Sequence, residues 1–112
     1  MSEIEHLSRD GFERALRDTP GPLIVDFWAA WCGPCRVVGP LLERLRREHP
    51  ELRIVKVNVD EEPELAAEHM IRGIPTVVRF EGGVEIRRAN GAVPYPELLR
   101  GLDIPDRQPE AA

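Results

Sequence analysis

An almost continuous apolar run at residues 23–28 and a segment rich in β-branched residues at 52–59 stand out along the chain. Runs of this length and β-branched content predict strands that are covered on both faces of a sheet. A shorter run, Ile4–Leu7, predicts an outer strand. Thr76–Phe80 and Val84–Arg88 lie on either side of a Glu-Gly-Gly turn, so they predict a hairpin.

Between these runs, apolar residues recur at the spacing of a helix face. Pro40 lies inside the second helical pattern and should kink that helix. The predicted helices run from a cap at Ser8 to about Arg17, from the two cysteines to Arg47, from a cap at Asp60 through Met70, and over Tyr95–Leu102.

The predicted order of elements is β-α-β-α-β-α-β-β-α. Such alternation is typical of an α/β fold in which helices cover both faces of a parallel sheet, and the hairpin must add antiparallel strands. We expect one domain over residues 1–104 and a disordered tail over residues 105–112. Functional groups should gather where the central strands end.

Composition and charge narrow the possible functions. The formal net charge is −5 without a basic stripe, which argues against nucleic acid as a partner. No apolar run approaches the length of about 18 residues that a membrane span needs. The first residues do not resemble a secretory signal, so we expect a cytoplasmic protein. Thiols stay reduced there, and a cysteine pair is then expected to be catalytic or metal-binding.

Both cysteines of the chain lie in Cys32-Gly33-Pro34-Cys35, where a strand pattern gives way to a helix pattern. This spacing at a helix start brings the two Cβ atoms within roughly 5–6 Å, close to disulfide range. Gly33 permits the tight approach and Pro34 stiffens it, so both should tune the redox chemistry. Cys32 lies at the positive end of the helix, which predicts a nucleophilic thiolate. Cys35 lies one turn deeper, and we expect it to be less exposed and to resolve the mixed disulfide.

Half of a zinc site is the alternative interpretation of the cysteine pair. A zinc site needs four ligands, and the only other candidates, His6, His49 and His69, are isolated in the sequence. We therefore favour redox chemistry, predict no metal, and assign the histidines structural or solvated places.

Asp26 is a carboxylate inside a strand that should be buried on both faces. Burial would raise its pKa and allow proton exchange near neutral pH, with Lys56, the only lysine, as a cationic partner in the neighbouring strand. The alternative is a carboxylate that caps a strand end. Ile74-Pro75 precedes the first hairpin strand, and base rates alone favour a trans bond there.

The cysteines belong to the longer motif Trp28-Ala29-Ala30-Trp31-Cys32-Gly33-Pro34-Cys35. Further motifs follow the same order along the chain: Val25-Asp26-Phe27-Trp28, Pro40, Val57-Asn58-Val59-Asp60, Arg72-Gly73-Ile74-Pro75-Thr76, Gly82-Gly83 and Asn90-Gly91-Ala92. With these residues in place, the chain resembles the thioredoxin family over about residues 4–102.

The resemblance implies a thioredoxin fold: a central mixed five-stranded sheet, with three parallel strands and an antiparallel hairpin, flanked by four helices. It implies a protein-disulfide reductase in which Cys32 attacks, Cys35 resolves, and Asp26 moves the Cys35 proton with Lys56 beside it. It also implies a cis bond before Pro75. The implied substrate-binding residues, here called the docking surface, are Trp31, Gly33, Pro34, Gly73, Ile74, Pro75, Gly91 and Ala92.

The same resemblance implies how the protein is used. It would act as a monomer without a bound cofactor, take disulfide-containing client proteins as substrates, and receive electrons from NADPH through a flavin-dependent thioredoxin reductase. A binding module with an incidental dithiol, and an oxidase or isomerase, are the alternatives. Departures from the family pattern are Arg36, Met70 and an irregular last helix with Pro94, Pro96 and Gly101.

Overall fold

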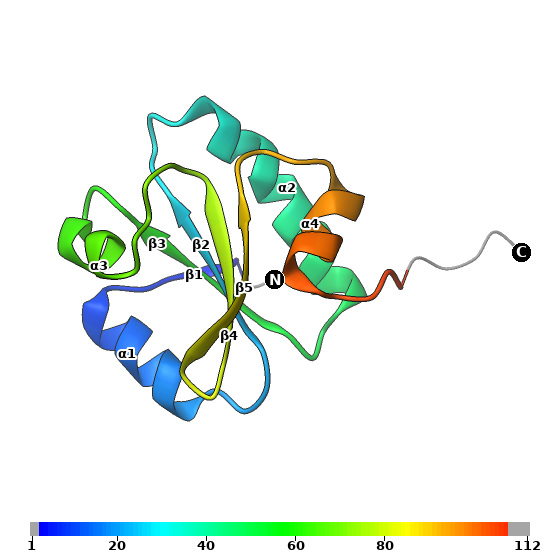
Figure 1. The fold of residues 1–112 in the computed structure, drawn as a ribbon, viewed down its shortest axis with the longest axis horizontal. Coiled ribbons are helices and arrows are strands. Elements are labelled where there is room, and N and C mark those ends of the chain that lie inside the picture. Colours follow the sequence, from blue (N-terminus) through cyan, green and yellow to red (C-terminus); the bar gives the residue numbers. More distant parts are fainter. Residues whose placement is uncertain (1–2, 108–112) are drawn as a thin grey trace, which may run out of the picture.

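A computed structural model of the protein describes residues 3–107. All predicted elements are present and in the predicted order (Figure 1). Their bounds are β1 (Glu5–His6), α1 (Arg9–Asp18), β2 (Leu23–Trp28), α2 (Gly33–Glu48), β3 (Arg53–Asn58), α3 (Pro63–Glu68), β4 (Thr76–Glu81), β5 (Val84–Asn90) and α4 (Tyr95–Leu102).

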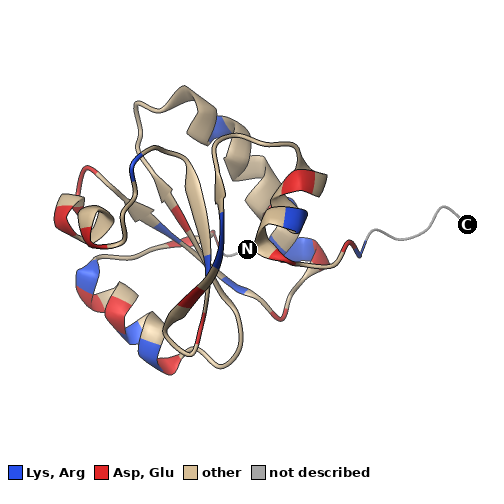
Figure 2. Ribbon diagram, in the orientation of Figure 1, with Lys and Arg blue, Asp and Glu red and all other residues tan. Residues whose placement is uncertain are grey.

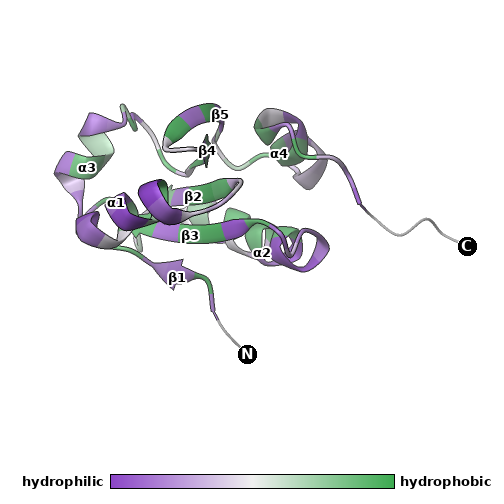
Figure 3. Cartoon of the chain, turned by 90° about the horizontal axis from the view of Figure 1, so that it is seen from below, coloured by the Kyte–Doolittle hydropathy of each residue, from purple (hydrophilic) through white to green (hydrophobic). Residues whose placement is uncertain are grey.

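The strands form one five-stranded sheet in the order β1-β3-β2-β4-β5. β3 pairs in parallel with both β1 and β2, whereas β4 pairs antiparallel with β2 and β5. This is the mixed sheet that the resemblance implies, so the predicted fold is confirmed. Viewed along the sheet, α1 and α3 lie on one side and α2 and α4 on the other (Figure 3).

Each face of the sheet has its own apolar core, which explains the continuous apolar runs of the central strands. Ile24 of β2 belongs to the core with α2 and α4, and Val25 belongs to the core with α1 and α3. Both side chains are fully buried. Asp26, next in line on the Ile24 face, therefore lies deep beneath α2.

Helix α3 differs from its prediction at both ends. Glu62, not Asp60, is the residue before its first turn, and no side chain caps it. Met70 lies beyond the helix in the left-handed region, with a φ of 54°. That conformation costs a residue with a Cβ roughly 1–2 kcal/mol relative to right-handed backbone, so contacts of the surrounding chain must hold it in place.

The predicted tail, residues 105–112, begins shortly after α4 ends at Leu102. Ile104 is still buried, and Arg107 donates a hydrogen bond to Glu51 at 2.9 Å. Residues 108–112 lie outside the described residues, so the disorder of the tail stays a prediction. Within residues 3–107, no helix is both long and apolar enough to cross a membrane.

Gly101 explains part of the irregularity of α4. A Cβ built on Gly101 would lie 3.1 Å from the Cβ of Ala89 in β5, closer than side chains normally pack. The glycine therefore allows α4 to approach the edge of the sheet, although glycine inside a helix is unfavourable by about 1 kcal/mol.

We predict opposite outcomes for two helix glycines. A Cβ on Gly39 of α2 would meet nothing within 4 Å, so Gly39→Ala should raise the free energy of unfolding by roughly 0.5 kcal/mol, Pro40 limiting the gain. Gly101→Ala should lower it by about 1 kcal/mol, because overpacking outweighs helix propensity. Urea unfolding measures both. An equal gain in the two variants would contradict a tight contact between α4 and β5.

Candidate active site

The cysteine pair lies where β2 ends and α2 begins. Cys32 is the N-cap residue of α2, and its Sγ accepts a hydrogen bond of 3.2 Å from the N–H of Cys35. Pro34 occupies the first turn, where a helix has no partner for an N–H. The sulfur of Cys32 therefore replaces the usual capping oxygen, at the end of the helix where positive potential favours a thiolate.

Cys32 and Cys35 form a disulfide with their Cα atoms 5.3 Å apart. The predicted difference in exposure is wrong for this form, because Cys32 is 3% and Cys35 6% exposed. The reason is that the disulfide packs against Ala29 and is covered by Trp28 and Ile74. Within residues 3–107, no group of three or more His, Cys, Asp or Glu side chains gathers to hold a metal ion.

Ile74 and Pro75 face the disulfide, as the resemblance implies. The carbonyl oxygen of Ile74 lies 3.8 Å from Cys32 Sγ, and the Ile74-Pro75 bond is cis. The trans interpretation from base rates was wrong. Pro75 is buried, and its carbonyl accepts a hydrogen bond of 2.8 Å from the N–H of Gly91, which fixes this loop to the end of β5.

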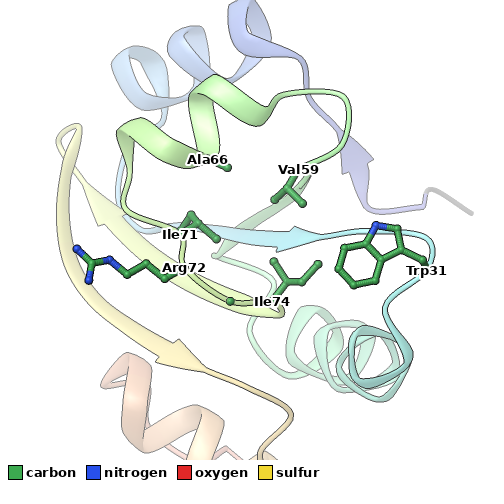
Figure 4. A pocket seen from close by; sticks show the side chains of 7 residues that line it. Trp31, Val59, Ala66, Ile71, Arg72 and Ile74 are labelled. Carbon is green, nitrogen blue, oxygen red and sulfur yellow. The ribbon is translucent and has the colours of Figure 1, made fainter.

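Two hollows flank Ile74 and give the docking surface its shape. One has a volume of about 320 Å³ and the other of about 350 Å³. Figure 4 shows the first, with Trp31 at one end and Arg72 at the other. Charged residues crowd α1, whereas the start of α2 is mostly uncharged (Figure 2). The first hollow is lined by Trp31, Val59, Ala66, Ile71, Arg72, Gly73 and Ile74, and the second by residues 72–76, Asn90 and Gly91.

The predicted docking residues are thus only partly gathered around these hollows. Trp31 and Gly91 line one hollow each, and both hollows reach Ile74. Gly33, Pro34 and Ala92 are exposed but line neither hollow.

Asp60 is a site residue that sequence reasoning missed. Its carboxylate accepts a hydrogen bond of 2.8 Å from Nε1 of Trp31, whose side chain is 69% exposed. This bond holds the indole at the rim of the first hollow. The sequence alone predicted Asp60 to be the N-cap of the third helix, and it contains no signal that this carboxylate accepts a bond from Trp31 instead.

Asp26 is 1% exposed and lies inside β2, so the alternative of a strand-end cap is excluded. It pairs in register with Lys56 of β3. Burial raises the pKa of Asp26 to about 7, and the charge of Lys56 opposes this rise. Oδ1 of Asp26 has no hydrogen-bond partner among the described residues. The carboxylate is therefore poised between its two protonation states at neutral pH.

Lys56 connects this carboxylate to the cysteines. It is half-buried, with Nζ 5.6 Å from the centre of the Trp28 ring. Together with Cys35 and Arg36 it borders a hollow of about 140 Å³. Lys56 thus lies beside the buried carboxylate and shares the lining of a hollow with Cys35.

The three histidines lie apart from one another. His49 is fully buried at the end of α2, and His69 packs edge-on against Phe12 and Phe80. His6 was not expected near the site, but its ring lies 5.3 Å from that of Trp28. The interpretation of these residues as structural agrees with their surroundings.

A disulfide at a helix N-terminus, a proline loop facing it and a buried carboxylate below it define a thiol-disulfide oxidoreductase. The thioredoxin family model matches residues 3–103. Thioredoxin 1 of a Nostoc species is 38% identical over 104 residues, which cover 92% of this chain and 97% of that protein. Thioredoxin 1 of Synechococcus elongatus is 40% identical over the same shares of the two chains.

Solved structures agree with the sequence matches. Mitochondrial thioredoxin 3 of Saccharomyces cerevisiae, in its oxidized form, has a TM-score of 0.81 and 34% identity and covers 89% of this chain and 93% of that one. The chain belongs to the thioredoxin family. It performs dithiol–disulfide exchange through its Cys32–Cys35 pair.

The raised pKa of Asp26 predicts how stability depends on pH. Between about pH 4 and the pKa of about 7, folded Asp26 keeps a proton that the unfolded chain has lost. The free energy of unfolding therefore falls as pH rises through this window. We expect Asp26→Asn to be more stable than the wild type at pH 8, by on the order of 4 kcal/mol, and equally stable near pH 4.

Urea unfolding of the oxidised proteins at the two pH values measures this difference. Asp10→Asn, at an exposed position of α1, serves as the control. Equal stability of Asp26→Asn and wild type at pH 8 would mean that Asp26 carries no raised pKa.

Proposed function

We propose that this protein reduces disulfides in client proteins and that a flavin-dependent thioredoxin reductase recharges it with electrons from NADPH. The observation that carries the proposal is the sulfur of Cys32, which caps α2 and lies 3.8 Å from the carbonyl of Ile74 between two apolar hollows. A nucleophile in this place can meet a disulfide that an extended client segment brings along the Ile74 loop.

The reaction transfers two electrons in two steps. Thiolate Cys32 attacks one client sulfur, the client disulfide breaks, and the departing client sulfur takes up a proton. Thiolate Cys35 then attacks the Sγ of Cys32, so the mixed disulfide breaks and the second client thiol leaves. The client disulfide is reduced to two thiols and the Cys32–Cys35 disulfide is formed.

Asp26 is proposed to accept the proton of Cys35 in the second step. A pKa of about 7 allows Asp26 to hold and release a proton at neutral pH. Lys56 favours the charged form of Asp26 and so keeps its pKa from rising further. Gly33 and Pro34 are proposed to tune the redox pair, and the docking surface to bind the client backbone.

The proposed partners and location follow from this chemistry. A reductase of client disulfides works where thiols are kept reduced, and we propose the cytoplasm and a monomer. Relatives differ in their location, since one 37% identical protein is named as a chloroplastic M-type thioredoxin of Chlamydomonas reinhardtii. The alternative of a binding module is disfavoured because both cysteines and Pro75 are in place.

Cysteine variants test the two-thiol scheme. Cys32→Ser should lower insulin reduction to the background rate of dithiothreitol alone, because the attacking sulfur is lost. Cys35→Ser should instead accumulate a covalent adduct with the client, visible as a mass increase that dithiothreitol removes. Wild-type turnover by Cys35→Ser would contradict the scheme. Turnover of the wild type with NADPH and a thioredoxin reductase, and no turnover without the reductase, tests the recharging step.

Asp26→Asn tests the proton transfer separately. We expect the second step to slow by roughly tenfold or more near pH 7, because Asn cannot accept the Cys35 proton. The pH–rate profile should lose the inflection near the pKa of Asp26. Asp10→Asn should leave the profile unchanged. If Asp26→Asn kept the wild-type profile, Asp26 would have no part in proton transfer.

A further inference from the structure

The loop that carries the docking surface begins at an unusual helix end. After α3, the N–H of Ile71 donates to the carbonyl of Ala66 at 2.9 Å and the N–H of Met70 donates to that of Ala67 at 3.0 Å. This is a Schellman arrangement, in which glycine is the common residue at the left-handed position. Here that position is Met70, with a φ of 54°, so the turn into the docking surface needs support from elsewhere.

Arg88 of β5 provides this support. Its Nη2 donates to the carbonyl of His69 at 2.8 Å and its Nη1 to the carbonyl of Met70 at 3.1 Å. Glu85 orients the guanidinium, because its carboxylate oxygens accept from Nε and Nη2 at 2.7 Å each. We call this set of bonds the Arg88 clamp.

The far end of the same loop is bonded to Gly91, which directly follows β5. The N–H of Gly91 donates to the carbonyl of Pro75 at 2.8 Å, and Thr76 Oγ1 donates to the carbonyl of Gly73 at 2.6 Å. Between these two anchors lie residues 71–74, of which residues 72–74 line both hollows and Ile71 lines the first. Arg88 of β5 and Gly91, directly after this strand, therefore hold the two ends of the client-facing loop.

We propose that Arg88 is a positioning residue for client binding: the Arg88 clamp fixes the loop that holds Ile74 against Cys32. Arg88 itself lines neither hollow, so it acts through the loop. The inference rests on the proposed function, because it concerns how the same surface binds protein disulfides.

The chain contains a matched control for this clamp. Arg79 of β4 donates to the carbonyls of Leu102 and Asp103 at 2.9 and 2.7 Å, at the end of α4. It also forms an ion pair with Glu81 at 2.9 Å. Arg79 thus makes the same kinds of bonds at another helix end, and its bonds are not to the docking loop.

The experiment compares Arg88→Met with Arg79→Met in the full chain. Insulin reduction with excess dithiothreitol gives KM and kcat, and reduction of dithiobisnitrobenzoate by the reduced protein reports the thiol chemistry without docking. We expect Arg88→Met to raise the KM for insulin about fivefold, with kcat and the small-disulfide rate within about twofold of the wild type. Arg79→Met should leave all three unchanged.

Hydrogen exchange gives a readout that does not depend on activity. The hydrogen-bonded amides of Met70 and Ile71 should exchange faster in Arg88→Met and at the wild-type rate in Arg79→Met. Arg88→Lys keeps the charge but loses the planar fork, so its KM should lie between those of Arg88→Met and the wild type. If Arg88→Met fails to fold, Glu85→Gln weakens the same clamp and should raise KM to a smaller degree.

An unchanged KM in a folded Arg88→Met would overturn the inference, and so would an equal rise in Arg79→Met. An equal fall in insulin and small-disulfide rates would also overturn it, because the effect would then lie in the chemistry of the cysteines. Failure of the proposed function looks different, since the wild type itself would then leave insulin oxidised.

Discussion

The chemistry of the site depends on two opposite electrostatic environments near the end of β2. One favours negative charge and the other opposes it. The N-terminus of α2 favours negative charge on Cys32, whose sulfur already accepts the N–H of Cys35. Two residues before the end of the same strand, Asp26 is 1% exposed and burial opposes its charge. The position of Cys32, just after β2, therefore stabilises an anion, whereas the position of Asp26, inside β2, destabilises one. Each environment follows from the position of the residue in the fold, which is the start of a helix for Cys32 and the interior of a buried strand for Asp26.

Much of this arrangement could be predicted from the sequence because it depends on local patterns. The bounds of β2 and α4 and the order of all elements follow from apolar runs and helical spacing. The role of Asp26 as a buried carboxylate follows from its place inside an apolar run. Asp26 and Lys56 lie at matching positions in β2 and β3. Their pairing therefore follows once these two parallel strands are expected to end at the same edge of the sheet.

What the sequence could not provide are contacts between distant segments. The bond from Trp31 to Asp60 joins residues 29 positions apart, and those from Arg88 to the end of α3 span 18 and 19 positions. No periodicity encodes such pairs. The burial of Cys32 likewise depends on a loop more than 40 residues away, since Ile74 covers it. The cis bond before Pro75 was inferable only from family resemblance, because its base rate is low.

The position of β5 at the edge of the sheet has a consequence for how such a protein can diversify. Asp26 lies in β2 and the cysteines lie at the start of α2, whereas β5 and Gly91 directly after it hold the two ends of the client-facing loop. As an edge strand, β5 pairs with β4 only, so its residues can change without repacking the central strands β2 and β3. Under the proposed role of Arg88, substitutions along β5 alter which proteins are recognised while the electron-transfer chemistry is inherited unchanged.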